Sequence, residues 1–74
     1  MKDRPYIDIG VRIYRLRTER GMSQRALAEA LGGAGNTMVC KWECGHALPS
    51  TKSLMSMSRL FGVTVDYILF GGKE

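Results

Sequence analysis

Three polar side chains lie close together near the middle of the chain and could form hydrogen bonds with the edges of nucleic-acid bases: Asn36, Thr37 and Lys41. An Asn amide can pair with N6 and N7 of adenine, a Lys ammonium can donate to O6 and N7 of guanine, and Thr offers a hydroxyl and a methyl group. Each also has a plainer interpretation. Asn36 would be the N-cap of a helix, Thr37 a residue of its first turn, and Lys41 a solvated surface charge.

Cys40, Cys44 and His46 form a second group, whose side chains are potential metal ligands. Thiols four residues apart on a helix share a face but are poorly placed for a disulfide. A structural zinc site normally has four ligands in paired motifs, and no fourth ligand is evident. We therefore expect two free thiols and neither a metal nor another cofactor, with metal binding and redox sensing as the alternatives. A single histidine, the lack of a Gly-x4-Gly-Lys phosphate loop and the small volume for a substrate pocket argue against an enzyme.

Hydrophobic periodicity predicts helices and no strands, and therefore an all-α fold. The five predicted helices cover approximately residues 8–20, 24–31, 36–44, 51–61 and 65–69. Ser23, Ser50 and Thr64 are expected N-caps, and Asp8 is expected to cap the first helix. That helix carries four arginines: Arg12, Arg15, Arg17 and Arg20. They are interpreted either as a solvated basic face or, for one or two of them, as phosphate contacts.

Apolar residues at helical spacing predict the core of this helical domain. They are Ile9, Ile13, Leu16, Leu27, Ala28, Leu31, Val39, Trp42, Leu54, Met57 and Phe61, together with Ser58. The register of the third helix has two solutions. Counting forward from Ala28 makes Met38 the inward residue, whereas counting back from Trp42 makes it Val39. We favour Val39, because it lies three residues before Trp42; this register leaves the three polar residues facing outward.

Residues 23–45 show the pattern of a helix-turn-helix motif, in which the second of two short helices enters the DNA major groove. The turn is Gly32-Gly33-Ala34-Gly35, whose glycines can adopt positive φ angles. The formal net charge of +4 suits a polyanionic partner. No stretch approaches the ~20 apolar residues of a membrane span, and the N-terminus lacks the features of a signal peptide. We expect one cytoplasmic domain over residues 1–74, with frayed ends at 1–6 and 71–74.

An ordered set of short segments resembles the XRE family of Cro/cI-type helix-turn-helix regulators. The segments are Ile9-Gly10 through Arg17, Gly21-Met22-Ser23-Gln24, Leu27-Ala28, Trp42-Glu43-Cys44-Gly45 and Leu48-Pro49-Ser50. The resemblance covers roughly residues 8–69. It implies a compact five-helix, lambda-repressor-like DNA-binding domain, with the turn of this chain one residue longer than is usual in the family.

The resemblance also implies roles for individual residues. The expected base contacts are Asn36, Thr37 and Lys41. The expected contacts with the DNA backbone are Gln24, Arg25, His46 and Lys52. Gln24 would also help to orient the recognition helix, while Arg17 and Glu43 would form a buried ion pair between the first and third helices. The alternative for Gln24 and His46 is plain solvent exposure.

The apolar run after the motif predicts self-association. Its residues are Tyr67, Ile68, Leu69 and Phe70. A core-only role is the alternative for Ile68 and Leu69, but not all four residues can point inward from one helical turn. Regulators of this type usually bind as twofold dimers to near-palindromic half-sites about 34 Å apart. We predict a homodimeric, sequence-specific double-stranded DNA-binding regulator, specifically a repressor, with no small-molecule effector. The alternative is an antitoxin or adaptor-type protein-interaction module with the same fold.

Overall fold

The computed structural model of the protein describes residues 4–33 and 35–72. Within this part of the chain, the secondary structure consists of five α-helices, with no strand. They are α1 (Ile7–Glu19), α2 (Gln24–Ala30), α3 (Asn36–Glu43), α4 (Thr51–Phe61) and α5 (Val65–Phe70). The all-α prediction is confirmed, and the predicted helix ends agree with these bounds to within one residue. The ends predicted to fray lie partly outside the described residues.

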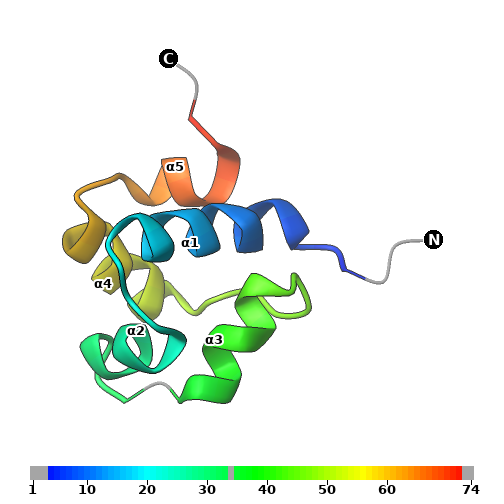
Figure 1. The fold of residues 1–74 in the computed structure, drawn as a ribbon. Helices are drawn as coiled ribbons and strands as arrows, with labels where there is room; N and C mark the ends of the chain where they lie inside the picture. Colours follow the sequence, from blue (N-terminus) through cyan, green and yellow to red (C-terminus); the bar gives the residue numbers. More distant parts are fainter. Residues whose placement is uncertain (1–3, 34, 73–74) are drawn as a thin grey trace.

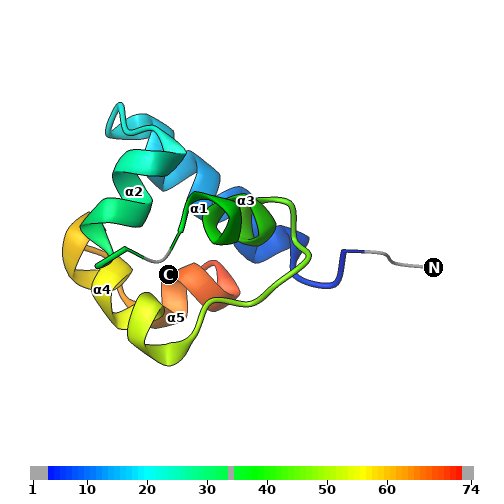
Figure 2. The ribbon, with the colours of Figure 1, turned by 90° about the horizontal axis from the view of Figure 1, so that it is seen from below.

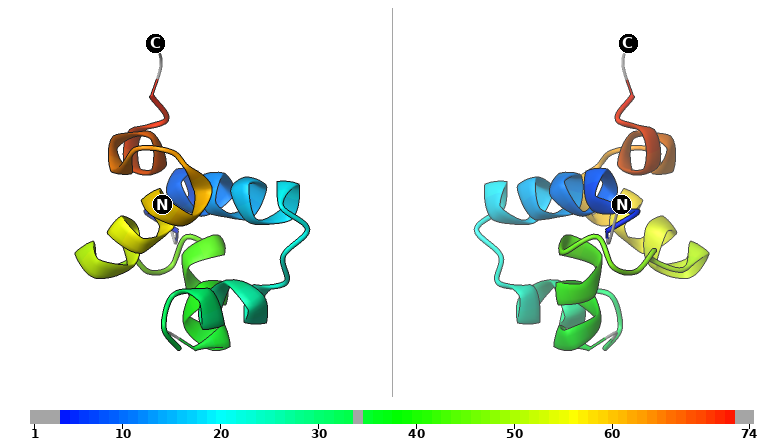
Figure 3. Two further views of the ribbon diagram at one scale, coloured as in Figure 1. Left: turned by 90° about the vertical axis from the view of Figure 1, so that its left-hand side faces the viewer. Right: turned by 90° about the vertical axis from the view of Figure 1, so that its right-hand side faces the viewer.

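The longest helix, α1, runs through the middle of the molecule (Figure 1), with α2 and α3 on one side of it and α5 on the other. Seen from below, α3 crosses α1, while α2 and α4 lie to one side of the crossing (Figure 2). The views in Figure 3 place α5 at the opposite end of the molecule from the turn between α2 and α3. The two motif helices, α2 and α3, therefore form the end of the domain that lies opposite α5.

Local capping begins three of the helices at the predicted residues. The side-chain oxygens of Ser23, Ser50 and Thr64 accept hydrogen bonds from backbone amides in the first turns of α2, α4 and α5. Each bond satisfies one of the amides that a helix N-terminus leaves without a partner. These three predictions are confirmed.

The prediction that Asp8 caps α1 is wrong. The helix begins one residue earlier, at Ile7, and its N-cap is Tyr6, which makes no side-chain capping bond. Instead, the backbone amide of Tyr6 donates to the carbonyl oxygen of Gly45, just after α3, at 3.1 Å. A contact with a distant segment therefore sets the start of α1.

The core lies where the motif helices, α1, α4 and α5 meet. Its buried members are Ile13, Leu27, Ala28, Val39, Trp42, Leu54, Met57, Phe61 and Ile68. The register of α3 follows the Val39 solution, because Val39 is 0% exposed and Met38 is 40% exposed. The predicted core residues Ile9, Leu16 and Leu31 are half-buried and pack against this cluster. Ser58 is half-buried as well.

Arg12 of α1 and Arg20, the residue that ends this helix, bind the C-terminal ends of other helices. The Arg12 guanidinium donates to the carbonyl oxygens of Ile68 and Leu69 at 2.8 and 2.9 Å. The Arg20 guanidinium donates to two carbonyl oxygens at the end of α4 at 3.0 and 2.9 Å. The last carbonyls of a helix lack partners within it, so these charges complete α5 and α4. Arg12 is therefore half-buried and structural rather than part of a solvated face, whereas Arg20 is exposed and also binds α4. Phosphate contact by the other arginines of this helix stays a prediction.

Candidate nucleic-acid interface

A glycine on α1 allows α3 to lie close to it. Gly10 is buried, and a Cβ atom at this position would lie 2.7 Å from the carbonyl oxygen of Glu43 and closer still to that of Trp42. Any larger residue would push α3 away from α1. The orientation of α3 therefore depends on the absence of a side chain at Gly10.

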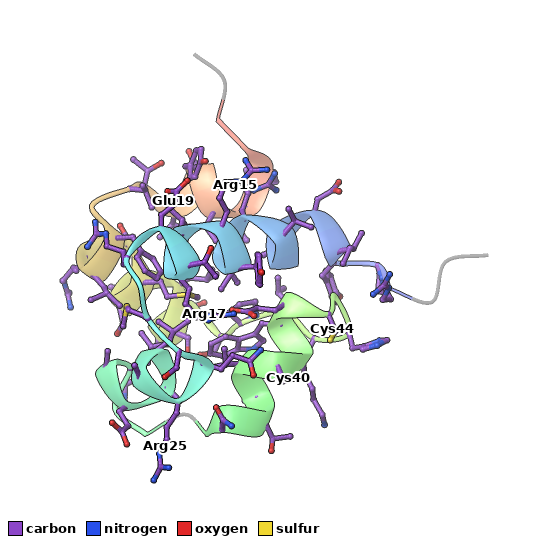
Figure 4. All side chains as sticks on the ribbon, in the orientation of Figure 1. Arg15, Arg17, Glu19, Arg25, Cys40 and Cys44 are labelled. Carbon is purple, nitrogen blue, oxygen red and sulfur yellow. The ribbon has the colours of Figure 1, made fainter. Side chains whose placement is uncertain are left out.

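A buried ion pair between Arg17 and Glu43 also holds α1 against α3. Arg17 Nε and Nη2 donate to the two carboxylate oxygens of Glu43 at 2.6 and 3.0 Å. The two side chains are only 10% and 6% exposed, and Arg17 lies between α1 and the motif helices (Figure 4). The hydrogen bond to Glu43 raises the pKa of Arg17 above its ordinary value. Arg17 Nη1 also donates to the carbonyl oxygen of Met22 at 2.7 Å.

Gln24 joins α2 to the same pair. Its side-chain Nε2 donates to Glu43 Oε1 at 3.0 Å. The first residue of α2 is thus tied to the last residue of α3, and through it to α1. Because the side-chain nitrogen of Gln24 binds Glu43 inside the protein, the alternative that this group is simply solvated is wrong. The network holds the two motif helices in one fixed arrangement.

The outward side of α3 carries the expected base-contacting residues. Asn36, Thr37 and Lys41 are all exposed, while Val39 and Trp42 on the opposite side are buried. The N-cap of α3 is Gly35, at φ 100°, so the alternative interpretation of Asn36 as the N-cap is wrong. The polar side chains are therefore free to contact a partner, on a helix whose other side is fixed in the core.

The four residues expected to contact the DNA backbone lie in three places. Gln24 and Arg25 belong to α2, His46 to the loop that follows α3, and Lys52 to α4. Arg25, His46 and Lys52 are exposed, and Gln24 is half-buried. Arg25 extends from α2 away from the body of the protein (Figure 4) and pairs with Glu29 at 3.5 Å. Both partners are largely solvated, with side chains 81% and 71% exposed, so this pair is weak. Arg25 and Asn36 also line one open hollow of about 440 Å³ between α2 and the start of α3.

The residues expected at a dimer interface have different environments. Ile68 is fully buried in the core, which removes it from any surface role. Tyr67 and Leu69 are half-buried, and Leu69 packs against the core. Phe70 is 78% exposed, the largest fraction among the exposed large apolar residues of the described chain. The apolar run therefore divides between the core and one protruding aromatic side chain.

Cys40 and Cys44 are both free, with Cys40 exposed and Cys44 half-buried. Among the residues that the structure describes, no group of three or more His, Cys, Asp or Glu side chains is arranged to hold a metal ion. No helix within the same part of the chain has the length and apolar character needed to cross a membrane.

Comparison with known proteins gives consistent matches. Residues 13–68 match the model of the family described as Helix-turn-helix. The chain is 35% identical over 65 residues to the HTH-type transcriptional activator BcrR of Enterococcus faecalis, covering 88% of this chain and 31% of that protein. It is 32% identical over 68 residues to the HTH-type transcriptional regulator ImmR of Bacillus subtilis, covering 92% of this chain and 51% of that protein. It is 34% identical over 68 residues to the HTH-type transcriptional regulator DicA of Escherichia coli, covering 92% of this chain and 50% of that protein.

The chain thus spans about half or less of the length of these three relatives. No solved structure matches it at a comparable level. The family is described as Helix-turn-helix and the relatives are named as transcriptional regulators, a class that is not enzymatic, and the prediction against an enzyme is confirmed on that ground.

Proposed function

Because the chain belongs to the XRE-type helix-turn-helix family, we propose that it is a transcriptional regulator that recognises a double-stranded DNA operator with α3 in the major groove. One observation carries this proposal. Asn36, Thr37 and Lys41 are exposed along a helix whose opposite side is buried. A helix that is held rigidly on one side and polar on the other is suited to contact base edges in a groove.

The proposed contacts divide by their chemistry. Asn36 and Thr37, in the first turn of α3, contact base edges, and Lys41, one turn later, contacts a further base. Gln24, at the N-terminus of α2, together with Arg25, His46 and Lys52, contacts phosphates. These contacts position the domain on the duplex, whereas the α3 contacts select the sequence.

The charges available for DNA are fewer than the composition indicates. Of the eleven Lys and Arg residues, Arg12, Arg17 and Arg20 donate to groups within the protein. The exposed cations near the motif, including Arg25, Lys41 and Lys52, therefore supply the attraction to phosphate. Each phosphate contact contributes about 0.9 to the slope of log affinity against log salt.

Self-association would give the regulator two half-sites. Phe70 is exposed on α5, at the end of the molecule opposite the α2–α3 turn, so an interface there leaves the motif free to bind DNA. A large exposed aromatic residue is a typical centre of a protein–protein contact. A homodimer through this surface would favour a near-palindromic operator. Occupying such an operator in the cytoplasm is sufficient to exclude other proteins from it, so we propose repression.

Selection of binding sites from a random duplex library tests the proposal. We expect the protein to enrich an inverted repeat at near-physiological salt, and Asn36→Ala and Lys41→Ala to lose or change it. Arg15→Ala is the matched control, because Arg15 is exposed on the side of α1 toward α5 (Figure 4) and its loss removes the same charge as Lys41→Ala. If the folded protein enriches no sequence, the proposal is refuted, and the protein-interaction alternative takes its place.

The dimer is tested separately by sedimentation. Phe70→Asp is expected to shift a dimer to monomer while the monomer stays folded, since the side chain is 78% exposed in the single chain. The same variant should then enrich single half-sites. A wild-type protein that is monomeric both free and on its selected DNA would exclude the dimer.

A further inference from the structure

Cys40, on the exposed side of α3, and Cys44, the half-buried C-cap of the same helix, lie one helical turn apart. Residues four apart on a helix bring their Cβ atoms within about 5–6 Å. The backbone amide of Cys44 donates to the carbonyl oxygen of Cys40 at 2.9 Å, so one helical turn joins the two residues. A hydrogen bond with the Cys44 thiol raises the pKa of Cys40. Both cysteines are free, and Cys40 is exposed. The pair is therefore accessible from solvent.

The geometry of the pair favours metal binding over oxidation to a disulfide. A disulfide requires Cβ atoms about 3.5–4.5 Å apart, closer than the helix holds them, so it would unwind the last turn of α3. Two metal–sulfur bonds of about 2.3 Å arranged in a line span about 4.6 Å between sulfur atoms. Side chains one helical turn apart can reach that separation without a change in the backbone.

The ligand set also restricts the metal. Zinc in a structural site takes four ligands, and the described residues offer no group of three or more His, Cys, Asp or Glu side chains for a metal. Two thiolates by themselves suit a soft monovalent cation, and thiolate ligands select copper(I). Two adjacent thiols therefore favour copper(I) over a four-ligand zinc site.

We propose that Cys40 and Cys44 form a two-thiolate site for copper(I). Binding breaks two S–H bonds, forms two Cu–S bonds and releases two protons, with no change in oxidation state. The pair changes from neutral to a net charge of −1. Because Cys40 lies one turn after Asn36 on the same side of α3, the new charge lies on the surface proposed to face DNA. This consequence, unlike the metal site itself, rests on the proposed function, and it predicts weaker DNA binding by the copper-loaded protein.

Competition with a chromogenic copper(I) chelator, without oxygen, tests the site on the full chain. We expect one copper(I) per chain, and affinity at least about 100-fold lower in both Cys40→Ser and Cys44→Ser. Met38→Leu is the matched control, because it removes another exposed sulfur atom from α3 and should keep full affinity. Circular dichroism verifies that each variant is folded. Full affinity in either serine variant, or one copper(I) for every two chains, would overturn the proposal.

DNA binding provides the second measurement. One added negative charge near the phosphates is expected to weaken binding to the selected operator about five- to tenfold, and the Cys40→Ser/Cys44→Ser double variant should show no copper effect. An unchanged affinity in the copper-loaded wild type would overturn the regulatory consequence. Failure of the metal-free protein to bind any DNA would refute the proposed function, but the chelator titration would still decide whether the copper site exists.

Discussion

Replacing Glu43 by glutamine tests whether the buried network holds the motif together. The wild-type carboxylate accepts three hydrogen bonds, two from Arg17 and one from Gln24, at 2.6 to 3.0 Å. Glu43→Gln keeps the shape of the side chain, but it removes the charge and turns an NH2 group toward donors. The Arg17 guanidinium, with its side chain only 10% exposed, then keeps the Met22 carbonyl and one neutral amide oxygen as acceptors, but it loses its counter-charge.

The expected loss is large compared with the stability of the domain. Removing one partner of a buried ion pair costs about 3–5 kcal/mol. A chain of 74 residues has a total free energy of unfolding of about 4–11 kcal/mol. We therefore expect Glu43→Gln to lose about 3 kcal/mol or more, and its melting temperature to fall by at least about 12 °C.

Urea unfolding, followed by the fluorescence of Trp42, measures this loss. Trp42 is the only tryptophan in the sequence and is buried beside Glu43 in α3. Glu29→Gln is the matched control, because it removes the same charge from the solvated pair with Arg25 and should cost less than about 0.5 kcal/mol. The double variant Arg17→Met/Glu43→Gln should recover part of the lost free energy of unfolding, because it also removes the buried guanidinium charge that Glu43→Gln leaves without a counter-charge. A loss below about 1 kcal/mol, or one equal to that of the control, would refute the reasoning.

Three further substitutions have defined expected outcomes in urea unfolding. Gly10→Ala should lower the free energy of unfolding by at least about 2 kcal/mol, because the new methyl group would overlap backbone carbonyls of α3; a gain of about 1 kcal/mol, as helix propensity alone predicts, would contradict the close approach. Arg12→Met keeps an apolar stem but loses both hydrogen bonds to the end of α5. It should cost about 1–2 kcal/mol and speed amide hydrogen exchange in α5, and unchanged exchange there would contradict it. Ser50→Ala removes the N-cap of α4 and should cost about 1 kcal/mol, whereas an unchanged midpoint would show that the cap is dispensable.

Features that depend on neighbouring residues could be predicted from the sequence. The caps at Ser23 and Ser50 follow from a hydroxyl that reaches an amide three residues later. The register of α3 follows from the three-residue spacing of Val39 and Trp42, which only a helix brings to one side. The buried tryptophan fixes this register from the C-terminal half of α3.

Features that depend on distant segments could not be predicted. The carbonyl oxygen that Arg12 binds most closely belongs to Ile68, 56 residues later, and no local pattern distinguishes this arginine from the solvated Arg15. The start of α1 is set by Gly45, which capping preferences cannot reveal. Likewise, an apolar run does not show which of its members are buried, and the core-only alternative applies to Ile68, which is 0% exposed. Which exposed residues of α3 contact bases depends on the DNA as well as on this chain.

The contacts of α1 also determine when the domain can form during synthesis. Gly10 and Arg17 pack against α3, and Arg12 binds the end of α5, 56 residues further along the chain. At about 5–20 residues per second, a ribosome makes Ile68 about 3–11 s after Arg12. Throughout that time, α1 has no partner for Arg12, and α5 cannot be completed at its C-terminal end. The contacts of α1 with α3 can therefore form before α5 is made, whereas those of Arg12 with α5 have to wait for the last of the five helices.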